Sequence, residues 1–114
     1  MSIIVIAPDS VARKLADFDD DVIIVCYHSA PEAIGEFAGS ADAVIIVSDG
    51  LSPEDLPVVA DAVLASNKPC IEVRGGRWDG TTFSPLSAAC RGVVSGFGPA
   101  AVARAVELLR AAPA

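Results

Sequence analysis

Two short polar segments carry carboxylates in positions where chemistry is expected. Pro8-Asp9-Ser10 and Ser48-Asp49-Gly50 each follow a run of apolar residues. Two carboxylates in one crevice can hold Mg²⁺, because this hard cation prefers oxygen ligands. A purely structural interpretation stands beside this one, in which Asp9 caps a helix and Asp49 shapes a turn. Asp9, Ser48 and Asp49 are therefore candidate ligand-binding residues, and no metal or cofactor is assigned to them.

A third segment, Arg74-Gly75-Gly76-Arg77, concentrates positive charge in an otherwise acidic chain. Glycine lets backbone N–H groups approach an anion closely, and arginine pairs with phosphate or carboxylate in bidentate fashion. The indole of Trp78 is able to stack on a flat ring. Arg74, Arg77 and Trp78 thus predict a loop for a nucleotide or another small anionic ligand. The alternatives are a subunit contact anchored by Trp78 and a solvated loop whose arginines pair with acids such as Glu72.

Complete catalytic motifs are missing from the sequence. The turn after the first apolar run has no glycine, so the dinucleotide fingerprint is absent, and neither a P-loop nor G-x-S-x-G occurs. His28 is the single histidine and has the chemistry of a general base, but no partner for it can be recognised from spacing. The cofactor, if one exists, is unknown at this stage.

Composition narrows the class of protein. The 114 residues suit one domain, covering 1–114, and the net charge of −7 argues against nucleic acid as a partner. The apolar runs are far shorter than the roughly 20 residues that a membrane helix needs. The chain opens on Met1-Ser2 and then Ile3, without a basic region, so we expect no signal peptide and a cytoplasmic location.

Cys26, Cys70 and Cys90 lack metal-site spacing and are interpreted as reduced core thiols.

Short apolar runs alternate with helical patterns along the chain. The runs rarely alternate apolar with polar residues, which is typical of parallel strands covered by helices on both faces. We therefore predict a five-stranded α/β three-layer sandwich, flavodoxin-like or Rossmann-like, with strand order 2-1-3-4-5 favoured over 3-2-1-4-5. The predicted strands are Ile3–Ala7, Val22–Tyr27, Ala43–Ser48, Cys70–Arg74 and Gly92–Phe97. The predicted helices are Val11–Phe18, Ser29 to about Gly39, Ser52 to about Ser66, a short one within Ser84–Cys90, and one after Gly98.

The predicted order has a consequence for the site. Ligands of open parallel sheets bind beyond the carboxyl ends of the strands, where the strand order reverses. The reversal lies between the first and third strands, so Asp9 and Asp49 are expected at one crevice, with Ser48 beside them.

The segment between the fourth and fifth strands, residues 75–89, is too rich in glycine for a full covering helix, and Asp79-Gly80 suits a small hairpin. The fourth strand also alternates, with Glu72 and Arg74 on one side. We therefore expect this part of the sheet to be partly open or covered by a second subunit, which predicts a homodimer.

The predicted layout resembles response-regulator receiver domains in architecture. Pro8-Asp9 supplies one of the acids that receivers carry after their first strand. Asp49 lies about two residues beyond the third strand, and Gly96-Phe97-Gly98 holds no lysine where receivers have one. The resemblance implies a non-catalytic regulatory or protein-interaction module. The alternative is a small anionic-ligand or nucleotide-binding protein, or a small enzyme, with its site at the strand carboxyl ends.

Overall fold

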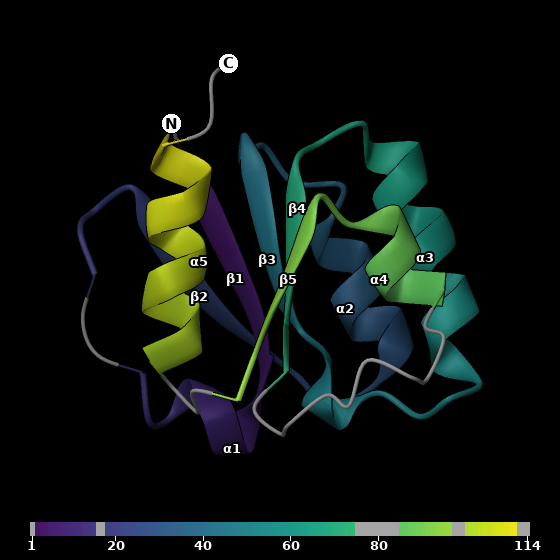
Figure 1. Cartoon of the computed structure of the whole chain (residues 1–114). Coiled ribbons are helices and arrows are strands. Elements are labelled where there is room, and N and C mark those ends of the chain that lie inside the picture. Colours follow the sequence, from purple (N-terminus) through teal and green to yellow (C-terminus); the bar gives the residue numbers. More distant parts are fainter. Residues whose placement is uncertain (1, 16–17, 75–84, 97–99, 112–114) are drawn as a thin grey trace.

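A five-stranded parallel sheet forms the centre of the molecule (Figure 1). The computed structural model describes residues 2–15, 18–74, 85–96 and 100–111. The strands are β1 (Ile3–Pro8), β2 (Val22–Tyr27), β3 (Ala43–Val47), β4 (Cys70–Arg74) and β5 (Gly92–Ser95). Their order in the sheet is β2-β1-β3-β4-β5. The predicted α/β class and the favoured strand order are therefore confirmed.

Helices cover both faces of this sheet. The helical elements are α1 (Asp9–Ala12), α2 (Ala30–Glu36), the 3₁₀ turn η1 (Ser48–Gly50), α3 (Asp55–Ser66), α4 (Pro85–Ala89) and α5 (Ala100–Ala111). In Figure 1, α5 lies on one side of the sheet, and α2, α3 and α4 lie together on the other. The short helix α1 follows β1 at the carboxyl edge of the sheet and packs with α5 against the same cluster.

The apolar strands are buried from both sides because successive side chains point to opposite faces. All five residues of β3 are fully buried. One core cluster joins alternate residues of the strands to α5, and its members include Ile3, Ile45 and Leu109. The other joins the intervening residues to α2, α3 and α4, and it includes Ile46 and Val59.

Local sequence signals explain where two of the helices begin and end. Ser29 precedes α2, and its hydroxyl accepts a hydrogen bond from the Glu32 backbone N–H at 3.4 Å. The Glu32 carboxylate in turn accepts from the backbone N–H of His28 at 2.9 Å, one residue before the N-cap, so the arrangement is close to a capping box. Asn67 ends α3 in the left-handed conformation, with φ of 58°, as its residue type predicts.

Two helices differ from the prediction. Regular helix in α1 stops at Ala12, and the chain continues in single turns, with the Leu15 N–H donating to the Ala12 carbonyl. The third helix was expected from Ser52, but α3 starts at Asp55, because a turn comes first. In that turn the Asp55 carboxylate accepts from the Ser52 N–H at 3.1 Å.

The sheet beside β4 is closed rather than open. Glu72 was expected on an uncovered side of this strand, but its side chain is 0% exposed. A second expectation also fails, since Cys26 is not a core thiol: it lies exposed on the edge strand β2. The predicted hairpin at Asp79-Gly80 lies outside the described residues. No helix in the described part of the chain is long and apolar enough to cross a membrane.

Candidate functional site

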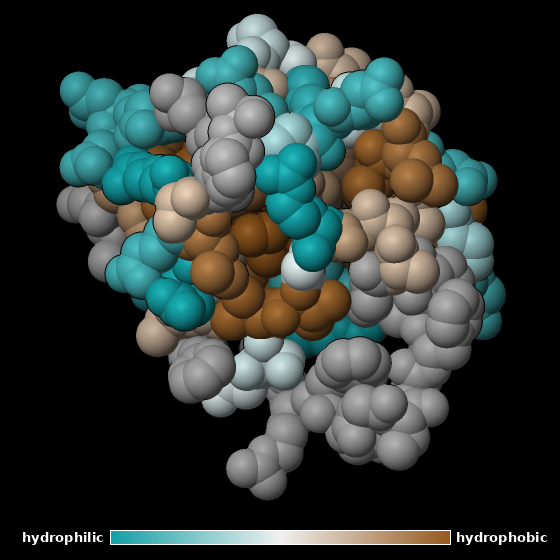
Figure 2. All heavy atoms as spheres, turned by 45° about the horizontal axis from the view of Figure 1, so that its top comes forward, coloured by the Kyte–Doolittle hydropathy of each residue, from teal (hydrophilic) through white to brown (hydrophobic). Residues whose placement is uncertain are grey.

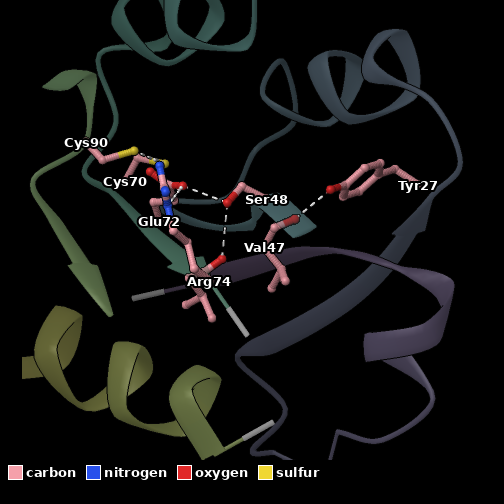
Figure 3. Close-up of polar contacts among 8 residues, drawn as sticks. Tyr27, Val47, Ser48, Cys70, Glu72, Arg74 and Cys90 are labelled. Carbon is pink, nitrogen blue, oxygen red and sulfur yellow. Dashed lines mark hydrogen bonds and ion pairs between the residues drawn. The ribbon is translucent and has the colours of Figure 1, made fainter. Parts of the chain in front are cut away.

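A buried polar cluster lies at the carboxyl ends of β3 and β4. The two strands are parallel, with Ile46 opposite Glu72, so Ser48 directly after β3 reaches the same face as Glu72 and Arg74. The Ser48 hydroxyl donates to Oε2 of Glu72 at 2.6 Å, and Nε of Arg74 donates to the same oxygen at 2.7 Å. Figure 3 shows the three side chains converging on this point.

The burial of Glu72 makes its partners necessary. A charged carboxylate without contact to water is costly unless a cation and hydrogen-bond donors surround it. Glu72 is 0% exposed and the Arg74 side chain 20%, so this is a largely buried ion pair. Among the described residues, no buried side-chain nitrogen or oxygen lacks a hydrogen-bond partner. The carboxylate is thus held by one donor from η1, Ser48, and one from β4, Arg74.

This arrangement suits proton transfer on an anionic molecule. A positioned carboxylate can accept a proton, and a serine hydroxyl bonded to it can pass one on, since a hydroxyl both donates and accepts. Arg74 adds positive charge, which favours a carboxylate or phosphate ligand. The cluster also lies at the strand carboxyl ends, where sheets of this kind bind their ligands.

Sequence reasoning found two members of the cluster and missed the third. Ser48 and Arg74 were assigned to two separate sites, and the structure brings them together. Glu72 was seen only as a partner for an arginine, and the pairing with Arg74 is what the structure shows. The available signal was an acidic residue inside an otherwise apolar strand, which requires a buried partner.

Asp9 and Asp49 follow neighbouring strands, β1 and β3. Asp9 accepts a hydrogen bond from Nε of Arg13 at 2.8 Å, and the Cys26 sulfur lies 3.8 Å from its other oxygen. The hydrogen bond from Arg13 holds the pKa of Asp9 below its usual range. Asp49 is exposed within η1. Among the described residues, no three His, Cys, Asp or Glu side chains are placed to share a metal ion, so a magnesium site here stays a prediction.

Tyr27 fixes the turn from which Ser48 projects. Its phenol donates to the Val47 carbonyl at 2.6 Å, as Figure 3 shows. The phenol oxygen also accepts from the Gly50 N–H at 3.2 Å. Both of these groups flank Ser48 in the chain. Burial raises the pKa of Tyr27 to about 12, so the phenol stays protonated and able to donate. Sequence reasoning treated Tyr27 only as a strand residue.

The remaining predicted groups contribute less to this site. The side chain of His28 is 71% exposed, and its Nδ1 lies 3.6 Å from Oε1 of Glu32 at the start of α2. This places the histidine on the surface in a helix-capping environment. Arg77 and Trp78 lie outside the described residues, so their role in ligand binding stays a prediction.

The fold is a flavodoxin-like α/β fold shared with solved enzyme structures. A type II dehydroquinase from Butyrivibrio crossotus DSM 2876 superposes with a TM-score of 0.71 at 17% identity, over 97% of this chain and 98% of that one. A 3-dehydroquinate dehydratase-like protein from Bifidobacterium longum gives a TM-score of 0.61 at 20% identity, over 94% and 92%. No protein-family model matches the sequence. A search of curated proteins finds no significant match either.

These neighbours correct the functional expectation. The architecture was taken to resemble receiver domains and hence to imply a non-catalytic regulatory or interaction module. That prediction was wrong, because the two structural neighbours are a dehydroquinase and a dehydroquinate dehydratase-like protein. The alternative of a small enzyme with its site at the strand carboxyl ends fits these neighbours better.

Proposed function

We propose that this chain is a small enzyme of the dehydratase type, with Ser48, Glu72 and Arg74 at its active centre. The observation that carries the proposal is the buried carboxylate of Glu72, held by two donors at the carboxyl edge of the sheet. Groups arranged for proton transfer are common at active sites, where burial and charge are tuned together. The names of the structural neighbours supply the reaction class.

The proposed substrate is 3-dehydroquinate or a related small carbocyclic hydroxy-keto acid. In such a molecule a base removes a proton from the carbon next to the ketone, and the hydroxyl on the following carbon leaves. Glu72 is the proposed base, and Ser48 is the proposed relay through which the proton is passed on. The departing hydroxide combines with a proton to form water, and the positive charge of Arg74 attracts the substrate carboxylate.

The test is an elimination assay with the full chain. Loss of water from a hydroxy ketone gives a conjugated enone, whose ultraviolet absorbance reports turnover directly. We expect Glu72→Gln to lower kcat by about 10²–10⁴-fold, the usual contribution of a positioned base. The control is Glu107→Gln. The Glu107 side chain is 68% exposed on α5 and forms an ion pair with Arg104, which is also exposed.

Two outcomes contradict this proposal. The first is a wild-type chain that forms no enone from 3-dehydroquinate or from related hydroxy-keto acids. The second is Glu72→Gln with unchanged turnover, which removes the carboxylate from the reaction. Binding without turnover, lost in Arg74→Ala, would instead indicate a small anionic-ligand protein.

We also propose that the protein is a cytoplasmic homo-oligomer that associates through the β5 edge. β5 pairs only with β4, which leaves its other edge without a neighbouring strand in the described sheet. Figure 2 shows apolar surface in the middle of one face of the molecule, surrounded by hydrophilic side chains. Exposed strand edges beside apolar surface favour association.

Native mass spectrometry and light scattering test this assembly. Val93 is half-buried on β5, and a lysine there should oppose edge pairing, so we expect Val93→Lys to be monomeric. Ile23→Lys is the matched control, because Ile23 is 55% exposed on β2 at the opposite edge. A monomeric wild-type chain would contradict the proposal. It would also be contradicted if Ile23→Lys alone dissociated the oligomer, because the interface would then lie at β2.

A further inference from the structure

Two cysteine thiols lie beside the polar cluster, on the same side of β4. Cys70 is the first residue of this strand and is 2% exposed, whereas Cys90 follows α4 and is half-buried. Their sulfur atoms are 3.7 Å apart, and both thiols are free (Figure 3). Neither takes part in the site described above.

Backbone hydrogen bonds hold the two cysteines beside each other. The Arg91 N–H donates to the Cys70 carbonyl at 2.7 Å, which attaches the residue after Cys90 directly to β4. The Cys90 N–H donates to the Leu86 carbonyl at 3.1 Å, which connects Cys90 to α4. A disulfide needs a sulfur–sulfur distance of roughly 2.0 Å. Rotation about the Cα–Cβ bonds is the movement that would close the remaining gap between the two sulfurs.

Solvent reaches one thiol of the pair more readily than the other. Both cysteines line an open surface hollow of about 340 Å³, which Lys68, Pro69 and Arg91 also line. Cys90 is the more exposed of the two. An oxidant that enters this hollow therefore reaches the Cys90 sulfur directly, whereas the Cys70 sulfur lies behind it. Cys90 is thus the sulfur that meets an oxidant first.

We propose that Cys70 and Cys90 are a redox site that a peroxide converts to an intramolecular disulfide. The Cys90 thiolate attacks a peroxide oxygen, so that an S–O bond forms, the O–O bond breaks, and water or an alcohol leaves. The Cys70 sulfur then attacks the Cys90 sulfur. An S–S bond forms, the S–O bond breaks, and a second water leaves with the Cys70 proton. The two thiols lose two electrons and two protons, and the peroxide gains them.

The surroundings of Cys70 support this order of events. The hydrogen bond with Cys90, followed by burial, raises the pKa of the Cys70 thiol well above its usual range. Cys70 is therefore a protonated, unreactive thiol while Cys90 is reduced. Oxidation of Cys90 to a sulfenic acid removes this hydrogen bond, which is the first cause of the raised pKa, so the Cys70 sulfur becomes able to resolve the intermediate.

The test uses the full chain carrying Cys26→Ala, because Cys26 is exposed and would react by itself. Hydrogen peroxide is the oxidant, and intact mass with peptide mapping under non-reducing conditions is the readout. We expect the loss of two hydrogen atoms per chain and one cross-linked peptide that contains Cys70 and Cys90. Dithiothreitol should reverse both changes.

The matched variant adds Cys90→Ser to the same background. Because Cys90 is half-buried, this variant should keep the native far-ultraviolet circular dichroism, and we expect its Cys70 to stay unmodified by peroxide. Accumulation of sulfinic acid on Cys90 without any cross-link would overturn the proposal. Equal oxidation of Cys70 in the presence and absence of Cys90 would overturn it as well.

Discussion

At the residue scale, Tyr27 connects the carboxyl ends of two strands, β2 and β3, that are not neighbours in the sheet. It ends β2, and its phenol reaches past β1 to the Val47 carbonyl and the Gly50 N–H. Burial of the ring accompanies these two hydrogen bonds, since Tyr27 is 2% exposed. The phenol thereby holds the backbone on both sides of Ser48, and the geometry of the polar cluster depends on it.

The raised pKa of Tyr27 predicts how stability responds to alkaline pH. Its value is about 12 in the folded chain and 10.0 when unperturbed, so above pH 10 the unfolded state loses the proton first. The contribution of Tyr27 to folding is therefore complete below pH 10 and is lost as the pH rises toward 12. Urea unfolding between pH 8 and pH 12 checks this.

Tyr27→Phe is the variant that isolates the effect. At neutral pH it should lower the free energy of unfolding by about 1–3 kcal/mol, because two backbone groups lose their partner. Above pH 10 the difference between wild type and Tyr27→Phe should shrink. A constant difference across this range would show that the phenol does not titrate with unfolding.

At the scale of elements, the close packing of η1 against β1 and β2 leaves no room for an extra methyl group at Gly50. A Cβ there would lie 3.0 Å from Cβ of Pro8 and 3.1 Å from the Tyr27 phenol oxygen. We expect Gly50→Ala to destabilise the fold by about 1–3 kcal/mol, because neither neighbour is free to move away. Thermal and urea unfolding measure the change.

Gly35 provides the control with the opposite sign. It is exposed within α2, and a Cβ there would meet nothing within 4 Å. Gly35→Ala should therefore stabilise the protein by about 0.5–1 kcal/mol through helix propensity. If both alanine variants behaved alike, the contacts of Gly50 would not be the cause of its effect.

The elements themselves were largely predictable because each carries its own local signal. Uninterrupted β-branched runs such as Ile3–Ala7 indicate strands buried on both faces, and Ser29 with Glu32 marks a helix start. Helix α1 was predicted too long, since Leu15 and Phe18 pack against the core without a regular helix. The spacing of these two apolar residues indicates that they are buried. Buried residues do not have to be in a helix, so the spacing alone did not fix the helix length.

The candidate site was less predictable, because it depends on the register between strands. Ser48 and Glu72 are 24 positions apart and meet only because Ile46 pairs with Glu72 across β3 and β4. Nothing in the local sequence of either residue fixes this pairing. The same holds for Tyr27, whose partners are Val47 at the end of β3 and Gly50 in η1, because β3 is not a neighbour of β2 in the sheet.

At the scale of the whole molecule, α5 is the long helix that packs against one face of the sheet. Its residues Val102, Ala105 and Leu109 are buried against Ile45 and other strand residues. Arg110 fastens the end of this helix to the segment before β2, with ion pairs of 3.3 Å to Asp19 and 2.8 Å to Asp21. The stability of the whole sheet therefore depends on the fit of this one helix.

Neighbouring leucines on α5 allow a direct test of that dependence. Leu109 is 1% exposed, and Leu109→Ala should lower the free energy of unfolding by about 2–5 kcal/mol through lost burial and a cavity. Leu108 is 39% exposed, so Leu108→Ala should have a much smaller effect. Equal losses in urea unfolding would mean that α5 is not the closing layer of this core.

The position of α5 in the chain has a consequence during synthesis. A ribosome releases all five strands before this helix, so β1 can already be flanked by β2 and β3. The face that α5 covers, which includes Ile3 and Ile45, nevertheless stays in contact with water until the helix has emerged. Nascent chains with such uncovered apolar surface are the ones that chaperones bind. One face of this sheet is therefore open to chaperone binding for longer than the other during synthesis.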